Sequence, residues 1–439
     1  MRKRLPLPPG PVVAEIESLD ARGRGIARVD GRAVHIPGVL PQERVAFRYV
    51  RRYRRSDQGA LLQVLDPHSE RVPIGCMHFD ICGGCKSQQL APGAQLALAE
   101  RNLITLLEEN DVRADAIRKP LDGPVWGYRR RARLAVRRVP KKGGVLVGFR
   151  EKASNYVADM HVCQVLEPRV GGRIGALRRL LDGLGIAAEI PQIEVSLGDE
   201  EGMLVLRHLA AMGPADVSKL RAFQEETGLG LALQPGGLDT VAPLDGGPLE
   251  PLRYELPDFS VTLEFLATDF IQVNRAINRK LVGEAIALLA PERGERLWDL
   301  FCGLGNFTLP IATSGCDVIG VDGEPELIER ARRNAEINGV EATFESRDLY
   351  RDVSLEALGP APDKVLLDPP RSGAREVVSS LVGLPAPPLR IVYVSCGPQS
   401  FAEDAALLAQ GGYELSEVGV VDMFPHTGHY ETLARFDRR

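Results

Sequence analysis

The segment Trp298–Pro310, WDLFCGLGNFTLP, constrains the fold more than any other part of this chain. The apolar residues around its start predict a buried strand at Arg296–Leu300, and a helix is expected from about Phe307. Between them, Gly303 and Gly305 allow a tight turn and a close approach of the backbone to a ligand. The first turn of the helix would present N–H groups to the same ligand. The segment therefore predicts a ligand site at the carboxyl end of a strand in an open sheet.

Three polar side chains around this loop indicate the class of ligand. The next predicted strand, Asp317–Val321, ends in Asp322, whose carboxylate can hold the two hydroxyls of a ribose. A dinucleotide-binding loop would have a third glycine where this chain has Thr308. Asp299 would repel a pyrophosphate but suits a ligand with positive charge. The loop favours S-adenosylmethionine, which has an amine and a sulfonium and no phosphate; a plain strand–turn–helix without a ligand is the alternative.

Length, composition and charge predict a multidomain α/β protein that binds a polyanion. The 439 residues correspond to two to four domains, and no run of about eighteen apolar residues predicts a membrane span. The start, MRKRLPLPPG, lacks the apolar core of a secretory signal, so a cytoplasmic protein is expected. Residues 1–67 carry a net charge of +6 and residues 129–152 carry +9, which leaves −20 for the rest of the chain. Two basic segments in an acidic chain favour a nucleic acid as partner, with solvated charged faces as the alternative.

Residues 1–67 are predicted to form an OB-like β-barrel, a fold that commonly binds nucleic acid. Its strands are expected at five short β-rich runs: Val12–Glu17, Ile26–Val29, Arg32–Ile36, Glu43–Tyr49 and Gly59–Leu65. The segment RYVRRYRR at 48–55 interleaves tyrosines with arginines. Bases could stack on the rings while the guanidinium groups neutralise phosphates.

A group of cysteines follows the barrel. Cys76, Cys82 and Cys85 fall within ten residues, which in a cytoplasmic chain favours a metal site over disulfides. Cys163 is the best candidate for a fourth ligand. Four thiolates suit zinc or an iron–sulfur cluster, and their spacing does not choose between the two metals. A set of uncommitted reduced cysteines is the alternative.

The remaining chain divides into a central α+β domain, residues 68–262, and a C-terminal Rossmann-like domain, residues 263–439. A helix is predicted at 90–111, which is also compatible with packing on the C-terminal domain. In the C-terminal domain helices and strands alternate, which predicts a doubly wound sheet with helices on both faces. Residues 413–421 and 430–436 are expected to add antiparallel edge strands.

Three polar residues lie at the ends of predicted strands, at the edge where the ligand should lie. Asp368 in LLDPPRSG and Cys396 in VYVSCGPQ follow a strand, and Glu431 in MFPHTGHYET comes ahead of the terminal strand. A thiol, a carboxylate and a methyl donor together indicate methylation of uracil. Carbon 5 of uracil is a weak nucleophile until a thiolate adds to carbon 6 and forms an enolate. That carbon then attacks the methyl group of the sulfonium, whose sulfur leaves as a neutral thioether. A base next removes the proton from carbon 5, and the thiolate is expelled.

Cys396 is the predicted nucleophile and Glu431 the predicted base. A packing cysteine and a surface carboxylate are the respective alternatives. His426 and His429 are expected to be structural or to contact RNA, because the reaction already has its nucleophile and its base.

The motifs DLFCGLGNF, LLDPPRSG, VSCGPQ and the terminal H-Y-E resemble those of the RNA uracil-5-methyltransferases. The four cysteines and the N-terminal barrel are similar to those of the branch that modifies 23S ribosomal RNA. The resemblance implies a TRAM domain at 1–67, a central iron–sulfur domain and a C-terminal S-adenosylmethionine-dependent methyltransferase domain. It implies a 4Fe-4S cluster on Cys76, Cys82, Cys85 and Cys163. It implies cofactor contacts from Gln272, Gly303, Gly305, Phe301, Asn306, Asp322, Asp348 and Asp368.

The resemblance also implies the substrate and the partners. The expected reaction is methylation of carbon 5 of one specific uridine in 23S rRNA through a covalent bond between Cys396 and carbon 6. A tRNA, another ribosomal uridine, and a non-catalytic RNA-binding assembly factor are the alternatives. No membrane and no obligate protein partner are expected, and the protein is expected to be a monomer that flips its target base out of the stack.

Overall fold

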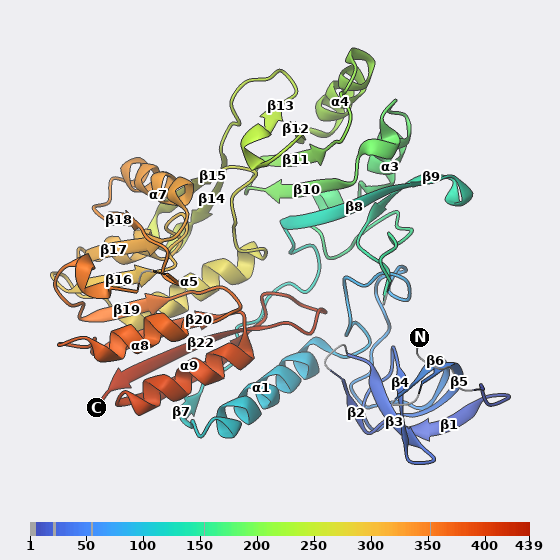
Figure 1. Cartoon of the computed structure of the whole chain (residues 1–439), viewed down its shortest axis with the longest axis horizontal. Coiled ribbons are helices and arrows are strands. Elements are labelled where there is room, and N and C mark those ends of the chain that lie inside the picture. Colours follow the sequence, from blue (N-terminus) through green and yellow to red (C-terminus); the bar gives the residue numbers. More distant parts are fainter. Residues whose placement is uncertain (1–5, 21–22, 54–55, 153, 352) are drawn as a thin grey trace. The chain divides into compact units, whose positions relative to one another are not determined.

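The computed structural model describes residues 6–20, 23–53, 56–152, 154–351 and 353–439 (Figure 1). These residues form two compact units that interleave along the chain. The first unit contains Met1–Leu98, Phe149–Met160 and Pro425–Gly428, and the second contains Ala99–Gly148, His161–Phe424 and His429–Arg439. Among the described residues, no helix is both long and apolar enough to cross a membrane.

The first unit contains a six-stranded sheet in the order β1-β5-β6-β4-β3-β2. The strands are β1 (Val12–Glu15), β2 (Ser18–Leu19), β3 (Gly25–Val29), β4 (Arg32–Ile36), β5 (Arg44–Arg52) and β6 (Asp57–Asp66). Their inward side chains, among them Ile36, Val45 and Phe47, form a separate apolar core. All five predicted β-rich runs are thus strands, whereas their assignment to a TRAM barrel remains a prediction.

The stacking role suggested for the tyrosines of residues 48–55 does not hold for Tyr49. Its ring is only 8% exposed, and its centroid lies 5.2 Å from that of Phe47. The Arg52 guanidinium covers the ring at 5.3 Å. Because side chains alternate along a strand, Tyr49 points into the core with Phe47 and is not available to a base. Arg54 and Arg55 of the same segment lie outside the described residues.

One sheet of the second unit has the order β13-β12-β11-β10-β8-β9. Its strands are β8 (Arg131–Val139), β9 (Gly144–Gly148), β10 (Gln192–Leu197), β11 (Gly202–Arg207), β12 (Gly230–Gln234) and β13 (Ala242–Pro243). The helices of this region are α2 (Pro168–Gly171), α3 (Ile174–Asp182) and α4 (Pro214–Thr227), and α1 (Pro92–Glu109) precedes it. A hairpin of β14 (Leu252–Leu256) and β15 (Val261–Phe265) follows. One apolar core runs from β11 through this hairpin to the C-terminal sheet, so these parts are packed as one unit.

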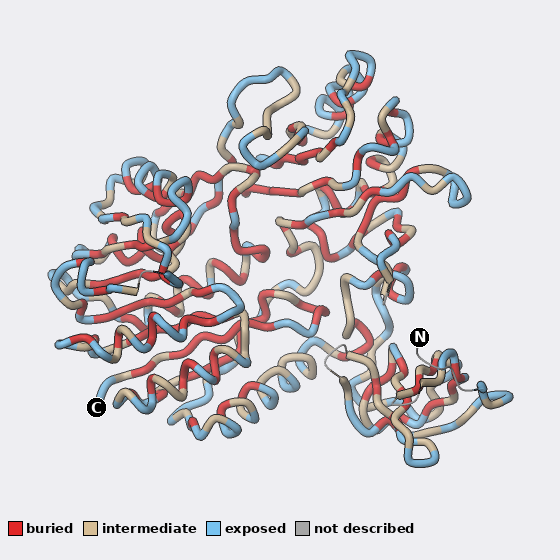
Figure 2. The backbone as a smooth tube through the Cα atoms, in the orientation of Figure 1, coloured by how far each residue is buried: buried red, intermediate tan, exposed pale blue. Residues whose placement is uncertain are grey.

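The C-terminal sheet has eight strands in the order β18-β17-β16-β19-β20-β22-β21-β7. The strands are β7 (Ala114–Ile117), β16 (Arg296–Leu300), β17 (Asp317–Asp322), β18 (Thr343–Ser346), β19 (Lys364–Leu367), β20 (Arg390–Ser395), β21 (Tyr413–Val421) and β22 (Glu431–Arg438). The helices are α5 (Arg275–Leu289), α6 (Thr308–Ala312), α7 (Pro325–Asn338), α8 (Arg375–Gly383) and α9 (Pro398–Gln410). In Figure 1, α8 and α9 cover one face and α5 the other, and Figure 2 shows the central strands buried. The predicted doubly wound sheet is therefore confirmed.

The edge of this sheet differs from the prediction. β22 lies between β20 and β21 and is antiparallel to both, so it is an internal strand. β7 pairs in parallel with β21 and forms the edge. The four residues of β7 are partly exposed and lie some 300 residues before β21 in the chain, so no local pattern marks this pairing.

Candidate active site

The glycine loop turns directly after β16. Phe301 has a φ of +70° and Gly303 one of +54°, in the left-handed region that favours glycine. A Cβ on Gly303 would meet no atom within 4 Å, so this glycine faces open space. The Gly303 N–H donates to Oδ2 of Asp322 at 3.0 Å, and Oδ1 of Asp322 accepts the N–H of Glu324 at 3.0 Å. These bonds hold the Asp322 carboxylate at the end of β17, where the sequence predicts ribose binding.

Asp299, on β16, is a fully buried carboxylate. One of its oxygens accepts the hydroxyl of Thr308, and the other has no hydrogen-bond partner among the described residues. Burial, and to a lesser extent the charge of Asp322, raises the pKa of Asp299 to about 7. A nearby cation would stabilise the ionised form, which agrees with the positive ligand that the sequence predicts here.

Asp368 lies beside Asp299, at the end of the adjacent strand β19. Its N–H donates to the carbonyl of Leu300 at 3.3 Å. Burial and the Asp299 charge raise its pKa to about 7, while a hydrogen bond from the Gln272 side chain opposes that rise. The structure thus brings together Asp368 and Gln272, two of the predicted cofactor contacts.

Two of the predicted cofactor contacts, Phe301 and Asp348, both contact Tyr350. The Phe301 and Tyr350 rings have centroids 5.7 Å apart, and Asp348 accepts the Tyr350 N–H at 3.0 Å. The Tyr350 hydroxyl donates to the carbonyl of Gly373 at 2.8 Å. Tyr350 was not predicted from the sequence, although its aromatic ring two residues after Asp348 was an available signal.

Asn306, a predicted cofactor contact, also links the glycine loop to neighbouring elements through its side chain. Its amide forms two reciprocal hydrogen bonds with the amide of Asn278, both 3.0 Å, and accepts the Tyr254 hydroxyl at 2.9 Å. These partners use the side chain to fasten the glycine loop to α5.

Cys396 and Glu431 emerge at the same edge of the sheet. Ser395 pairs with Thr432 in the antiparallel ladder of β20 and β22, so the next residue on each side is Cys396 and Glu431. Glu431 is 3% exposed, and its Oε2 has no hydrogen-bond partner in the described part of the chain. Burial first, and then the Asp368 charge, raises the pKa of Glu431 to about 8.

The Cys396 thiol is half-buried, and its environment disfavours the thiolate in the absence of ligands. Burial, together with the charges of Glu431 and Asp368, raises its pKa to about 11. The positive charge of Arg371 and a hydrogen bond with its side chain lower the Cys396 pKa. Arg371 was not predicted from the sequence, although it directly follows the two prolines after Asp368.

Gly397 is required where the chain passes Arg371. A Cβ at this position would lie 2.6 Å from the Arg371 carbonyl oxygen. The Ser400 hydroxyl donates to the same carbonyl at 3.0 Å. The residues flanking the thiol are therefore closely packed, which fixes the direction of the Cys396 side chain.

Two further side chains near the site have structural roles. The Tyr430 hydroxyl, just before Glu431, accepts a hydrogen bond from Asn102 on α1 at 2.8 Å. Cys302, in the glycine loop, is buried, and burial near Asp299 holds its pKa well above the usual value for a thiol.

The predicted cluster ligands are divided between the two units. Cys76, Cys82 and Cys85 belong to the first unit and Cys163 to the second. The three thiols of the first unit all act electrostatically on Lys152, and Cys82 Sγ accepts the Gly84 N–H at 3.4 Å. Across the described ranges, no three His, Cys, Asp or Glu side chains are placed to hold a metal ion. The four-cysteine ligand set therefore stays a prediction.

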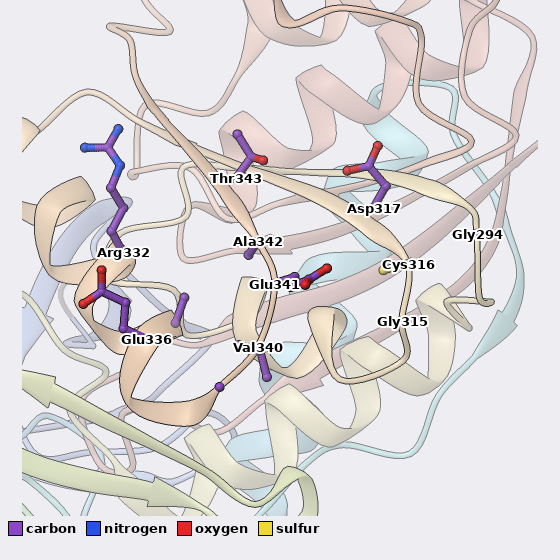
Figure 3. A pocket seen from close by; sticks show the side chains of 12 residues that line it. Gly294, Gly315, Cys316, Asp317, Arg332, Glu336, Val340, Glu341, Ala342 and Thr343 are labelled. Carbon is purple, nitrogen blue, oxygen red and sulfur yellow. The ribbon is translucent and has the colours of Figure 1, made fainter.

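A hollow of about 690 Å³ lies at the opposite end of the strands from this crevice (Figure 3). It is lined by Asp317 and Thr343, the first residues of β17 and β18, and by Cys316 and Arg332. None of the residues predicted to bind the cofactor or to act on substrate lines it. Its size alone does not make it the functional site.

Comparison with known proteins shows which family this chain belongs to. Residues 253–438 match the family model described as tRNA (Uracil-5-)-methyltransferase. A protein of Alkalilimnicola ehrlichii named 23S rRNA (uracil(1939)-C(5))-methyltransferase RlmD is 47% identical over 441 residues, covering 100% of this chain and 99% of its own length. The protein of the same name from Bordetella parapertussis is 48% identical, covering 97% of this chain and 93% of its own length. The chain belongs to the RlmD family.

A solved structure supports the fold of this RlmD-family chain. The Pyrococcus abyssi tRNA (uracil-54, C5)-methyltransferase, in complex with S-adenosyl-L-homocysteine, superposes with a TM-score of 0.73. It is 24% identical and covers 97% of this chain and 100% of its own length. At that identity the likeness concerns the fold alone, and it confirms the predicted Rossmann-like methyltransferase architecture of the C-terminal part.

In this RlmD-family chain, the predicted site residues fall into two groups. The strand ends bring together Gln272, Asp322, Asp368, Cys396 and Glu431 with the glycine loop. The second group is Asn306, which lies in the glycine loop and is bonded to Asn278, and Asp348, which is exposed and accepts the Tyr350 N–H.

Proposed function

We propose that this protein transfers a methyl group from S-adenosylmethionine to carbon 5 of a uridine in 23S rRNA, the position numbered 1939 in the names of its relatives. The observation that carries this proposal is the pairing of β20 with β22, which sets a thiol and a buried carboxyl side by side. Both lie close enough to Asp368 for its charge to act on them.

The cofactor site is proposed at the glycine loop. S-adenosylmethionine supplies an electrophilic methyl group on a positively charged sulfur. Asp322 would accept the ribose hydroxyls, and Asp299 and Asp368 would face positive charge. Phe301 would lie against the adenine, supported by Tyr350. Asp299 and Asp368 both have pKa values near 7 without ligand, so a cationic ligand would favour their ionised forms.

Cys396 is proposed to start the reaction by adding its sulfur to carbon 6 of the uracil ring. The new C–S bond places electron density on carbon 5, which makes that carbon able to accept the methyl group. The thiol must first lose its proton, and its pKa of about 11 opposes this. The Arg371 hydrogen bond favours the thiolate, and a cation bound beside Asp368 would favour it further.

Glu431 is proposed to complete the reaction. Its ionised carboxylate removes the proton from the methylated carbon 5, and the electron pair of that C–H bond re-forms the ring double bond and expels the Cys396 thiolate. The unpartnered Oε2 of Glu431 leaves one oxygen available to accept this proton. Passing this proton from Glu431 to the expelled thiolate restores the ionised carboxylate and the Cys396 thiol, and the proton that the thiol lost at the start is the net proton released.

The accessory sites are proposed from the donor chemistry of the chain. Cys76, Cys82, Cys85 and Cys163 would hold a 4Fe-4S cluster, which thiolates bind well. The Gly84 N–H bonded to Cys82 is the kind of contact that tunes such sulfurs. The six-stranded sheet of the first unit is proposed to be a TRAM domain that contacts RNA. An rRNA substrate implies a cytoplasmic protein, and a monomer is proposed.

Methylation in vitro tests the function. The purified protein, a labelled methyl donor and transcripts of 23S rRNA and of tRNA should yield 5-methyluridine at one site in the 23S transcript only. Methylation of the tRNA transcript alone would show that tRNA is the substrate. No methylation of either RNA would favour a non-catalytic assembly factor. Mass mapping of rRNA from cells with and without the gene checks the site in vivo.

A further inference from the structure

A small cavity of about 120 Å³ lies in the second unit at the start of α5. It is lined by Tyr128, Arg130, Glu167, Asn274, Arg275 and Ala276, among others. Its volume corresponds to roughly four water molecules at ~30 Å³ each, which suits a phosphate group rather than a nucleobase. The residues that line it decide what kind of ligand it can take.

Arg130 is a buried cation with unused donors. It is 2% exposed, and neither Nη1 nor Nη2 has a hydrogen-bond partner among the residues that the structure describes. Its Nε donates to the Gln272 carbonyl at 2.9 Å, and its guanidinium covers the Tyr254 ring at 4.5 Å. Burying a charge without hydrogen bonds is costly, so an acceptor in the cavity would satisfy the two remaining nitrogens.

The start of α5 adds further donors to the same cavity. Asn274 caps the helix by accepting the Ile277 N–H, and its Nδ2 is fully buried without a hydrogen-bond partner in the described chain. Arg275 and Ala276 form the first turn of this 15-residue helix and also line the cavity. The N–H groups of a first helical turn have no acceptor within the helix, so they favour an anion.

The nearby carboxylates leave an excess of positive charge. Asp199 is shared by three guanidinium groups: it bonds Arg279 at 2.7 Å and lies 3.4 Å from Arg275 and 3.8 Å from Arg130. Glu167 is already bound by both Nε and Nη2 of Arg169. One negative charge among three positive ones cannot neutralise them, and a phosphate would supply the missing charge.

We infer that this cavity binds one backbone phosphate of the RNA substrate. The inference rests on the proposed function. Through Gln272, whose carbonyl holds Arg130 and whose side chain holds Asp368, the phosphate would be fixed next to the crevice that receives the target base. Phosphate contacts position a nucleic acid without reading its sequence, so this site would set the depth at which the flipped uridine enters.

The test uses full-length Arg275→Gln, because the Arg275 side chain is 49% exposed and its loss should not prevent folding. Arg332→Gln is the matched control, since Arg332 is also 49% exposed but lines the hollow at the other end of the strands. Binding is measured with a synthetic 23S rRNA fragment that contains the proposed target uridine. Arg275→Gln should weaken binding roughly fivefold and reduce the salt dependence by about one phosphate contact, while Arg332→Gln should change neither.

A scan of neutral methylphosphonate linkages through that fragment identifies the phosphate. One position should weaken binding to the unmodified protein severalfold and have no further effect on Arg275→Gln. Arg130→Lys, if it folds, should likewise show no further loss of binding from that neutral linkage, because the single lysine nitrogen cannot replace the two unpaired nitrogens of Arg130. No coupled linkage, with methylation of the fragment intact, would overturn the inference and leave the proposed function standing.

Two other ligands could offer the same oxyanion chemistry. If Arg275→Gln weakened S-adenosylmethionine binding but not RNA binding, the cavity would serve the cofactor carboxylate and the inference would be wrong. If calorimetry showed inorganic phosphate binding that depends on Arg275 while the scan found no coupled linkage, the site would take a free phosphate, which also overturns it. Failure of every RNA to be methylated would instead count against the proposed function.

Discussion

Ser395 pairs with Thr432 across β20 and β22, and this single register places Cys396 beside Glu431. The two residues are 35 positions apart in the chain. Cys396 directly follows β20 and Glu431 begins the antiparallel strand β22, so both lie at the same edge of the sheet. A slip of one residue would send one of the two side chains to the opposite face. The chemistry of the site therefore depends on the pairing of a terminal strand that lies inside the sheet.

Substitution of the two reacting residues should separate bond formation from release. Cys396→Ala should abolish methylation, because no other described thiol lies in the crevice in a reactive form. Glu431→Gln should still form the bond to carbon 6 but slow its resolution by about 100- to 10,000-fold, so RNA should stay attached. Denaturing electrophoresis with labelled RNA detects the adduct, and Cys316→Ala serves as the control. Full activity of Cys396→Ala would contradict the assignment.

The stability of the ligand-free protein should depend on pH through Glu431. Its pKa is about 8 in the folded protein against an ordinary 4.5, so between these values the unfolded chain loses a proton that the folded chain keeps. The free energy of unfolding therefore falls as pH rises from 4.5 to 8, and levels off above. Glu431→Gln has no ionisable group at this position. The Tm of the parent should therefore fall by a few degrees relative to that of Glu431→Gln as the pH rises from 5 to 8. Calorimetry of both proteins at pH 5 and pH 8 checks this, and an equal change in Tm for the two proteins would contradict it.

Gly397→Ala should damage the site through its backbone. The added Cβ would lie 2.6 Å from the Arg371 carbonyl oxygen, so either Arg371 or Cys396 must move. A displacement of about 1 Å at a reacting group can lower turnover roughly a hundredfold. Gly383→Ala is the control, because a Cβ there meets no atom within 4 Å. Equal kcat values for the two variants would show that the close approach is unimportant.

The Asn102–Tyr430 hydrogen bond should stabilise the strand that carries Glu431. Tyr430→Phe removes the hydroxyl that accepts from Asn102 and should cost about 1 kcal/mol of unfolding free energy. Asn102→Ala should cost a similar amount, and the double variant should cost less than the sum. Urea denaturation of the four proteins gives the coupling energy, and strict additivity would mean that the contact contributes nothing.

Anaerobic purification tests the proposed cluster. The protein should contain iron and sulfide in equal amounts, and Cys82→Ser should lose most of both because it removes one ligand. Cys316→Ser, at a cysteine far from the proposed ligands in the chain, should retain them. One zinc per chain with no iron would exclude the iron–sulfur assignment.

The residues that are proposed to carry the chemistry, and their places at strand ends, were predictable from local sequence. Gly303, Asp322, Asp368 and Cys396 each follow an apolar run at a break marked by glycine or proline, and such breaks are local signals of strand ends. Parallel strands end at one edge of a sheet, so these side chains had to converge once the α/β alternation was recognised.

Only the tertiary structure decided the contacts between distant segments. The pairing of β7 with β21, the internal place of β22, the burial of Tyr49 and the bonding of Asn306 to Asn278 all depend on partners far away in the chain. The unpaired nitrogens of Arg130 are another case, because the basic run YRRR looks the same whether an arginine is exposed or buried. Sequence patterns indicate which segments can form a strand or a loop, whereas burial and strand pairing are properties of the packed chain.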